Sequence, residues 1–234
     1  MLAEIQGHTF YLPALSTASV VFDLGAAGAG FAQEINRRTG CICHCAEASP
    51  VLIETMARGR GIHHHHVAIC GKDGPFKMTV GGRDKERYWV KWEGASGISE
   101  KDIMEVPGLT LESFYKYCTV DQVDLIKVDI EGAEFSMFDS VSDETICRAA
   151  QWTIEFHDFI DPSLTPKVLA IIQRMRQLGY ADIIMTRHAH GDVLFLDTSR
   201  LKINSSQLFY MRSALKYSRG VRRMLSRLLD RLHR

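Results

Sequence analysis

A short apolar run, followed by an acidic residue and a turn of small residues, limits most strongly how this chain can fold. The stretch VVFDLGAAGAG begins at Val20, passes through Asp23 and ends at Gly30. The apolar run predicts a buried strand, and the small residues let the backbone of the turn approach a ligand closely. A helix that starts after such a turn offers unpaired N–H groups to the same ligand. The stretch therefore predicts a strand, a ligand-binding turn and a helix.

The order of the glycines and a second acidic strand end indicate the ligand. Gly25, Gly28 and Gly30 follow the order G-x-x-G-x-G, whereas dinucleotide sites use G-x-G-x-x-G. Asp23 suits a cationic amino-acid part better than a pyrophosphate. Glu47 ends the next apolar run, where a carboxylate can accept both hydroxyls of a ribose. Together these features predict a site for S-adenosylmethionine, and the simpler alternative is a tight turn that binds nothing.

Apolar runs and helical patterns alternate along the chain, which predicts a mostly parallel sheet with helices on both faces. The expected strands are 20–22, 41–46, 63–69, 125–128 and 152–156, with 183–186 and 193–196 as an antiparallel final strand pair. The expected helices are 29–39, 50–58 with Ser49 as its N-cap, 110–116, 132–139 and 166–178. Residues 71–108 are expected to form a hairpin and a long loop. Asp23, Glu47, Asp129 and His157 all follow strands of this α/β sheet, so we expect one shared site.

Three of the cysteines and four of the histidines lie in two short segments of the sequence. Cys41, Cys43 and Cys45 alternate along one expected strand, so they share a face and are expected to be buried free thiols of a reducing compartment. With no signal-peptide layout and no run of 18 apolar residues, we expect a cytoplasmic protein. Residues 63–66 are four consecutive histidines. A strand points them to alternate faces, so at most two could share a metal, and we interpret the run as incidental.

Four segments resemble the FkbM-type methyltransferases. They are VVFDLGAAGAGFA, CHCAEASP, VDLIKVDIEGAEFSMF at 123–138 and WTIEFHD at 152–158, and the similarity covers roughly residues 15–200. The chain departs from the family at Ala27, where the family often has Asn. The resemblance implies a class I (Rossmann-like) methyltransferase fold, S-adenosylmethionine as the methyl donor, and an oxygen acceptor on a sugar or natural product.

The donor site that follows from the turn and the resemblance has three parts. The methionine part is assigned to the first turn, the ribose to Glu47 and its neighbours, and the adenine ring to the end of the third strand. The predicted donor-binding residues are Asp23, Gly25, Ala26, Ala27, Gly28, Glu47, Ala48, Ser49, Val67, Ala68 and Asp129.

The acceptor side is expected at the ends of the fourth and fifth strands. His157 is the predicted catalytic base, because the ordinary pKa of histidine, about 6.5, lies near working pH, and Asp129 is predicted to orient donor or acceptor. Glu131 and Glu134 are interpreted as structural, since acids favour the start of a helix. The glycine-rich loop with Tyr88, Trp89 and Trp92 is either an acceptor lid or a packed hairpin. A divalent-metal site is the less favoured alternative, built from Asp129, Glu155, His157 and Asp158.

Charge divides the chain into two parts. Residues 201–234 contain nine basic residues and one acidic residue, so residues 1–200 carry a net charge of −8. We expect a methyltransferase domain over 1–200, which does not bind nucleic acid, and a basic amphipathic helical tail over 201–234. The tail places an apolar stripe inside an arginine-rich surface, at Val221, Met224, Leu225, Leu228 and Leu232. Peripheral contact with an anionic membrane is one expectation for the tail, and packing on the domain or on a second copy in a homodimer is the other.

The function predicted from the sequence is therefore an S-adenosylmethionine-dependent O-methyltransferase. Its expected acceptor is a hydroxyl of a small molecule, such as a glycan, glycolipid or natural-product sugar. Two alternatives stay open: a degenerate methyltransferase fold that serves as a binding protein, and a nicotinamide-dependent oxidoreductase on a similar sheet. The glycine order and the IKVDIEGAE string speak against the oxidoreductase.

Overall fold

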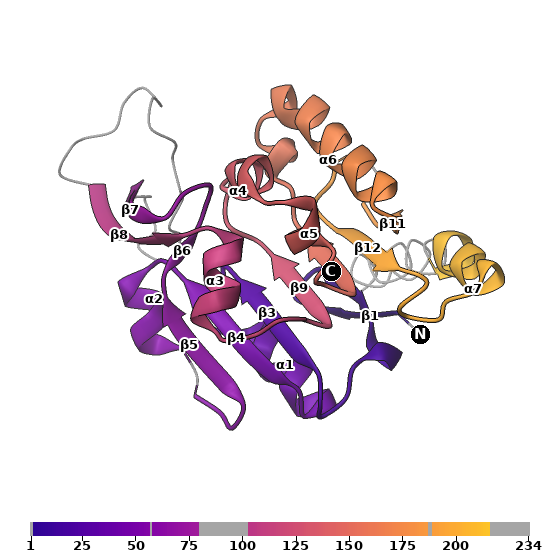
Figure 1. Cartoon of the computed structure of the whole chain (residues 1–234), viewed down its shortest axis with the longest axis horizontal. Coiled ribbons are helices and arrows are strands. Elements are labelled where there is room, and N and C mark those ends of the chain that lie inside the picture. Colours follow the sequence, from indigo (N-terminus) through magenta and orange to yellow (C-terminus); the bar gives the residue numbers. More distant parts are fainter. Residues whose placement is uncertain (1, 57, 80–102, 187–188, 216–234) are drawn as a thin grey trace, which may run out of the picture.

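Seven strands form the main sheet of the computed structural model, which describes residues 2–56, 58–79, 103–186 and 189–215 (Figure 1). The strands lie in the order β11-β12-β10-β9-β3-β4-β5. The strands β10, β9, β3, β4 and β5 run parallel, while β12 runs antiparallel to both of its neighbours. Their bounds are β3 Val20–Leu24, β4 Ile42–Glu47, β5 Ile62–His66, β9 Leu125–Val128, β10 Gln151–Ile154, β11 Tyr180–Ile184 and β12 Val193–Asp197. The predicted α/β class with an antiparallel final strand pair is confirmed.

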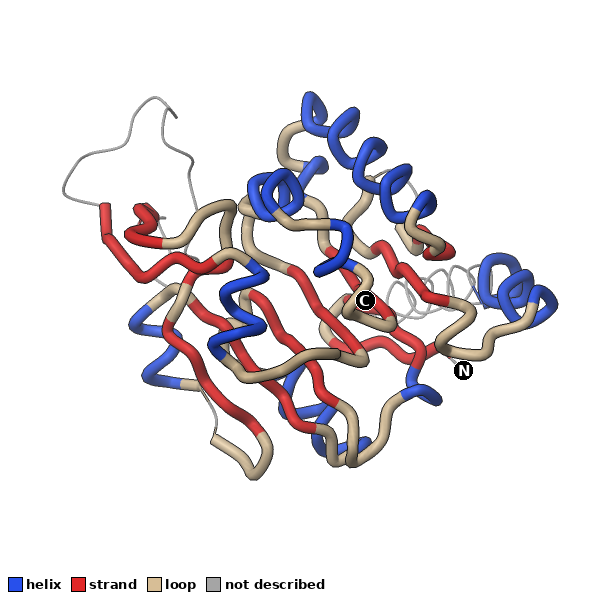
Figure 2. Tube along the Cα trace, viewed as in Figure 1, coloured by secondary structure: helices blue, strands red, loops and turns tan. Residues whose placement is uncertain are grey.

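Alternating side chains of the strands bury both faces of this sheet. In β3, Phe22 joins the larger core with side chains of α3 (Leu111–Tyr117), α4 (Glu134–Ser140), α5 (Asp143–Ile146) and α6 (Thr165–Gln177). Val21 joins the opposite core with side chains of α1 (Gly30–Thr39). Figure 2 shows these helices in front of and behind the sheet. Cys41, Cys43 and Cys45 are buried free thiols of the α1 core, as predicted. Because both faces are covered, a ligand reaches the sheet at its strand ends.

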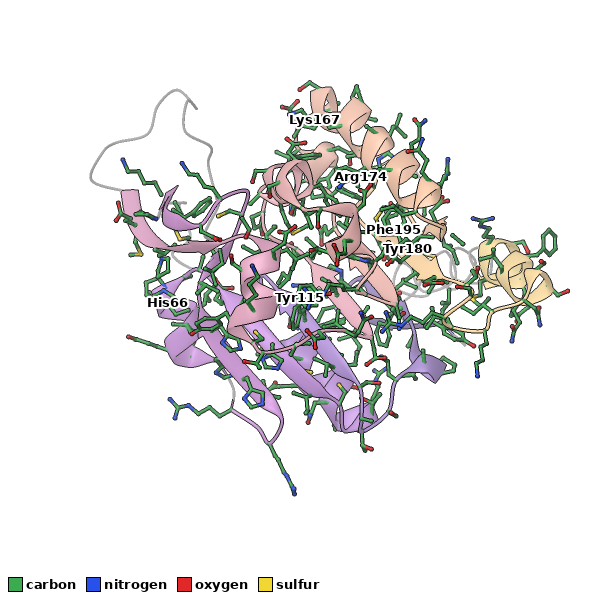
Figure 3. All side chains as sticks on the ribbon, in the orientation of Figure 1. His66, Tyr115, Lys167, Arg174, Tyr180 and Phe195 are labelled. Atoms are coloured by element: carbon green, nitrogen blue, oxygen red, sulfur yellow. The ribbon has the colours of Figure 1, made fainter. Side chains whose placement is uncertain are left out.

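One arginine of helix α6 hydrogen-bonds to the end of α4. Arg174, labelled in Figure 3, donates hydrogen bonds of 2.7 and 2.6 Å to the carbonyl oxygens of Phe138 and Val141. These carbonyls lie at the end of α4, where no further helical N–H reaches them. The contact fixes the end of α4, and α4 itself begins at the strand-end edge of the sheet.

An N-terminal hairpin, which the sequence analysis did not predict, covers part of the α1 face. Its strands are β1 (Leu2–Ile5) and β2 (His8–Tyr11). Phe10 is fully buried in the α1 core. Thr9 ties the hairpin to the loop before β12, since its N–H and its hydroxyl donate to Asp192 at 3.0 and 2.6 Å. The hairpin thereby brings His8 to the strand-end edge.

The prediction of one continuous third strand over 63–69 is wrong. It divides into β5, in the main sheet, and β6 (Ala68–Ile69), which pairs with β8 (Ile103–Leu109) in a smaller sheet that also contains β7 (Gly74–Thr79). The chain leaves the main sheet at Val67, because the next residues pair with β8 instead of β4. The β7–β8 pair is the predicted hairpin within 71–108, while Tyr88, Trp89 and Trp92 lie outside the described residues.

The helices predicted within the domain are all present and differ in length, whereas α5 was not predicted. The predicted helix 50–58 is α2, Pro50–Thr55, and Ser49 is its N-cap through a hydrogen bond from the N–H of Leu52. After β12 the chain forms α7 (Ser205–Tyr210) and a π-helical turn over Met211–Leu215. Ile203 and Met211 are buried against Leu2 and the strand β12, so the first part of the predicted tail packs on the domain. The rest of the tail, 216–234, lies outside the described residues, and none of the helices described elsewhere is long and apolar enough to cross a membrane.

Candidate active site

The acidic strand ends meet at one edge of the sheet. Asp23 lies in β3, Glu47 ends β4, and Asp129 directly follows β9. These three strands are neighbours in the order β9-β3-β4, and β10, which precedes Glu155 and His157, lies beside β9. The register of parallel strands thus brings together carboxylates that are more than 100 residues apart in the sequence.

The glycine turn is packed on one side and open on the other. Gly25 has a φ of 75°, and a Cβ there would overlap the carbonyl oxygen of Asp129, so the position requires glycine. A Cβ on Gly28 would meet no described atom within 4 Å. Ala27 and Ala29 also adopt left-handed backbone, with φ of 46° and 60°. The turn is therefore held against Asp129 and leaves room at Gly28 for a ligand.

Glu47 joins the turn to the end of β4. Its carboxylate accepts hydrogen bonds from the N–H of Ala27 at 2.8 Å and from the N–H of Ser49 at 2.7 Å. Burial raises the pKa of Glu47, and these two N–H groups oppose that rise. A carboxylate has about four lone-pair sites, so each oxygen can accept a further hydrogen bond. Ala48 is half-buried beside it, and Ala26 is buried in the α1 core.

Val67 and Ala68, the predicted adenine wall, follow directly on the end of β5. Glu47 and His66 are register partners in the β4–β5 pair, so Val67 lies one residue beyond the level of Glu47. Val67 and Ala68 are buried, at 6% and 5% exposure. The structure thus places the predicted ribose and adenine residues on adjacent strand ends.

Asp23 is fully buried beside a lysine that the sequence analysis missed. The Lys127 ammonium lies 3.2 Å from Asp23 Oδ1 and 3.6 Å from Asp129 Oδ2, and it donates to the carbonyl oxygen of Gly25 at 2.6 Å. Burial works to lower the pKa of Lys127, but the charges of Asp23 and Asp129 outweigh it and raise the pKa. Lys127 therefore stays charged and binds β3, the turn and Asp129 together, and Asp23 faces Lys127 instead of solvent.

His157 is held by two glutamates. Its Nδ1 lies 3.0 Å from Glu134 Oε1, and its Nε2 lies 3.3 Å from Glu131 Oε2. Glu134 is fully buried and also accepts the N–H of Ile130 at 3.1 Å. The interpretation of these glutamates as purely structural was therefore incomplete. Glu131 has a φ of 53°, a conformation that costs a side-chain-bearing residue energy and is often found at functional sites.

The carboxylates around His157 change its protonation. Burial alone would lower the pKa of His157, but the hydrogen bond to Glu134 and the charges of Glu134, Glu131 and Asp129 raise it to about 9. His157 accordingly carries a proton at neutral pH before any ligand binds. The prediction of His157 as the base assumed an ordinary histidine pKa. That assumption does not hold for the free protein.

Asp129 lies at the centre of the edge. His8 Nε2, from the hairpin, is 3.7 Å from Asp129 Oδ2 and 4.0 Å from Glu155 Oε2. Burial would raise the pKa of Asp129, but its interaction with His8 and the positive charges of Lys127 and His157 lower it to about 2. Burial raises the pKa of Glu155. Asp129 is thus an anion across the working pH range, whereas Glu155 binds protons more readily than an exposed glutamate.

The four residues named for the alternative metal site do not form one group. Asp158 points to His190, whose Nδ1 lies 2.6 Å away, and accepts from the Thr165 hydroxyl. Within the described residues, two sets of three at the edge place ligand atoms within 4.8 Å of one another and could hold a divalent cation. They are His8 with Asp129 and Glu155, and Asp129 with Glu131 and His157.

A mostly parallel seven-stranded sheet, a glycine turn after its central strand and an acidic end on the next strand define a class I methyltransferase fold. The family model described as the methyltransferase FkbM domain matches residues 30–181, which is well over half of the chain. The chain therefore belongs to the FkbM methyltransferase family and is an S-adenosylmethionine-dependent methyltransferase. The match begins at Gly30, so the assignment of Asp23 to Gly28 depends on the geometry of the turn.

Two solved structures illustrate what the fold is similar to. The precorrin-6y C5,15-methyltransferase from Geobacter metallireducens GS-15 is 12% identical, with a TM-score of 0.38, over 79% of this chain and 82% of that one. A protein assigned as a sarcosine dimethylglycine methyltransferase from Galdieria sulphuraria is 12% identical, with a TM-score of 0.39, over 73% of this chain and 57% of that one. A comparison with curated proteins found no significant match.

Proposed function

We propose that this methyltransferase acts on oxygen and methylates a hydroxyl of a small acceptor, with a sugar of a glycan, glycolipid or natural product as the acceptor class. The observation that supports this best is the imidazole of His157, held by Glu134 at Nδ1 with its Nε2 at the strand-end edge beside Asp129. A hydroxyl must lose a proton when it is methylated. A histidine whose Nδ1 is held by the buried Glu134 is suited to take that proton at Nε2, whose nearest carboxylate partner, Glu131 at 3.3 Å, is partly exposed.

The residues present fit S-adenosylmethionine. Gly28 leaves the open side of the turn free, and Gly25 lets the turn lie against Asp129. Glu47 keeps lone pairs for the two ribose hydroxyls after accepting Ala27 and Ser49. Val67 and Ala68, at the neighbouring strand end one residue beyond the level of Glu47, are assigned to the adenine ring. Because Asp23 is paired with Lys127, we assign it to holding the turn and not to direct contact with the donor.

When bound, S-adenosylmethionine supplies a methyl group already activated by its sulfonium charge. The chain's own residues then position the acceptor and manage its proton. Positioning of two reactants can lower the barrier by about 7–11 kcal/mol in favourable cases. Asp129 stays anionic and accepts a hydrogen bond from a second hydroxyl of the acceptor, while the neutral form of His157 takes the proton of the reacting hydroxyl at Nε2. A nearby positive charge favours the neutral imidazole, so a bound cationic donor would lower the pKa of His157 from its value of about 9 in the free protein.

Glu155 is the second candidate for the base. Its pKa is raised by burial, and it shares His8 with Asp129. A Glu155→Gln variant that loses turnover while His157→Gln retains it would transfer the role to Glu155.

The acceptor atom is tested with methyl-labelled donor and a panel of hydroxylated, amine and thiol acceptors. The proposal expects a methyl ether on a sugar or natural-product hydroxyl, identified by mass spectrometry of the product. Transfer to nitrogen, sulfur or carbon alone would contradict it. Donor binding without transfer to any acceptor would support the degenerate binding protein, and binding of a nicotinamide cofactor in place of the donor would support the oxidoreductase.

A further inference from the structure

Histidines from two strands and a cysteine from a helix meet on the sheet face that α3 covers. In the β4–β5 register His44 is the partner of His63, and Ala46 is the partner of His65. Since side chains alternate along a strand, His44, His63 and His65 share one face. Cys118 follows α3 directly as its C-cap residue. This cluster, the β4–β5 histidine cluster, is separate from the strand-end edge to which we assign the donor.

Three donor atoms of the cluster converge. His44 Nδ1 lies 3.0 Å from His65 Nε2, and Cys118 Sγ lies 3.8 Å from the same His65 Nε2. Together the three atoms lie within 4.8 Å of one another. A ring nitrogen has either one hydrogen or one lone pair to offer, so His65 Nε2 cannot satisfy both neighbours by hydrogen bonding.

The spacing agrees with tetrahedral zinc. With Zn–N near 2.0–2.1 Å and Zn–S near 2.3 Å, two tetrahedral ligand atoms lie about 3.3 Å apart for N–N and about 3.6 Å apart for N–S. The observed 3.0 and 3.8 Å each differ from these distances by about 0.3 Å or less. The third pair, His44 and Cys118, lies within 4.8 Å, and side-chain rotation would close the difference when a metal binds. Imidazole and thiolate ligands suit zinc and other transition metals, whereas magnesium and calcium prefer oxygen.

We propose that His44, His65 and Cys118 form a Zn²⁺ site. Methyl transfer from S-adenosylmethionine does not require this metal. On binding, the Cys118 thiol releases its proton to solvent and its sulfur bonds to the metal. All three side chains are half-buried, so the site is open to an ion from solution. His63 stacks on His44, with ring centroids 5.0 Å apart, and is exposed. His63 or a water molecule completes the fourth position.

The site ties an edge of the sheet to a helix. β5 is the last strand of the main sheet on its side, and α3 lies in front of β4 in Figure 1. A metal held by β4, β5 and the end of α3 would join this hydrogen-bonded strand pair to the helix that covers it. A ligand that binds only the folded state stabilises it, so Zn²⁺ should raise the melting temperature.

Cobalt titration of the purified full chain, stripped of metal by a chelator, tests the proposal. One equivalent of Co²⁺ should bind with a sulfur-to-cobalt charge-transfer absorption in the near ultraviolet, and Zn²⁺ should displace it. The absorption should disappear in Cys118→Ser and remain in Cys147→Ser, whose thiol is exposed elsewhere. His65→Ala should weaken Co²⁺ binding at least about tenfold. The control His66→Ala, which strand alternation places on the opposite face of β5 from His65, should bind as the wild type does.

Circular dichroism confirms that each variant is folded, and thermal unfolding gives a second measurement. Zn²⁺ should raise the melting temperature of the wild type and of Cys147→Ser, but not of Cys118→Ser. A wild type without the charge-transfer absorption would overturn the proposal. The same conclusion would follow if Cys118→Ser kept the absorption, or if Zn²⁺ stabilised it as much as the wild type.

Discussion

The pair of Glu134 and His157 gives the most quantitative prediction. His157 has a pKa of about 9 in the folded protein and an ordinary value of 6.5, and the hydrogen bond and charge of Glu134 contribute most to the rise. Replacing Glu134 with Gln keeps an acceptor for the N–H of Ile130 and removes the charge. Burial lowers the pKa of His157, and without the charge of Glu134 less remains to raise it. The pKa of His157 should therefore fall to its ordinary value or below.

The effect on stability follows from the sign of the shift. A histidine whose pKa is raised on folding contributes stability below the unfolded pKa of 6.5, and this contribution is lost as the pH rises through 9. The difference between the two pKa values corresponds to about 3 kcal/mol at 1.36 kcal/mol per unit. Relative to the Glu134→Gln variant, the wild type should therefore lose about 3 kcal/mol of unfolding free energy between pH 6 and pH 9.5.

Urea unfolding of both proteins across this pH range measures the difference directly. Groups that titrate alike in both proteins cancel in the comparison. The kcat/KM profile supplies an independent readout, because it reports the pKa of the essential groups in the free enzyme. At pH 7 about 1% of His157 is neutral with a pKa of 9, against about three quarters with a pKa of 6.5. Parallel stability curves and identical pH profiles for the two proteins would refute the coupling of Glu134 to His157.

Three further predictions follow from the same edge and from the tail. His157→Ala should lower kcat by about 10² to 10⁴ and leave donor affinity nearly unchanged, and full activity of this variant in steady-state kinetics would exclude it as the base. Lys127→Met leaves Asp23 buried without its cation, so denaturant unfolding should show a loss of about 3–5 kcal/mol, and a loss under 1 kcal/mol would show that the ion pair is dispensable. Removing residues 206–234 should reduce salt-sensitive co-sedimentation with anionic vesicles, and equal sedimentation of both chains would leave the tail as a packing or dimerisation element.

The sheet could be predicted because its signals are local. Each central strand is a short apolar run that ends in an acid, as at Asp23, Glu47 and Asp129, and the parallel register then brings the acids together. The N-terminal hairpin has two strands of four residues, too short for a periodic signal. The division of the third strand at Val67 escaped prediction because four consecutive histidines hide the alternation that marks a strand.

The partners of the site residues could not be predicted for a different reason. His8 is 121 residues from Asp129 in the sequence, and only the folded hairpin brings them together. Lys127 did offer a signal, since a lysine inside the apolar strand LIKV must be paired when buried. Glu134 offered none, because an acid in the first turn of a helix is common whether or not it holds a histidine.

Donor binding at Glu47 tests the central claim most directly. Isothermal titration calorimetry with S-adenosylmethionine should show binding to the wild type and to Glu54→Ala, an exposed control on α2. Glu47→Ala should weaken binding by about 1–3 kcal/mol, the scale of hydrogen bonds to a charged group. NAD should bind none of the three proteins tightly. Tight NAD binding without donor binding, or equal donor affinity in Glu47→Ala and Glu54→Ala, would contradict the assignment of this strand-end edge as the methyl-donor site.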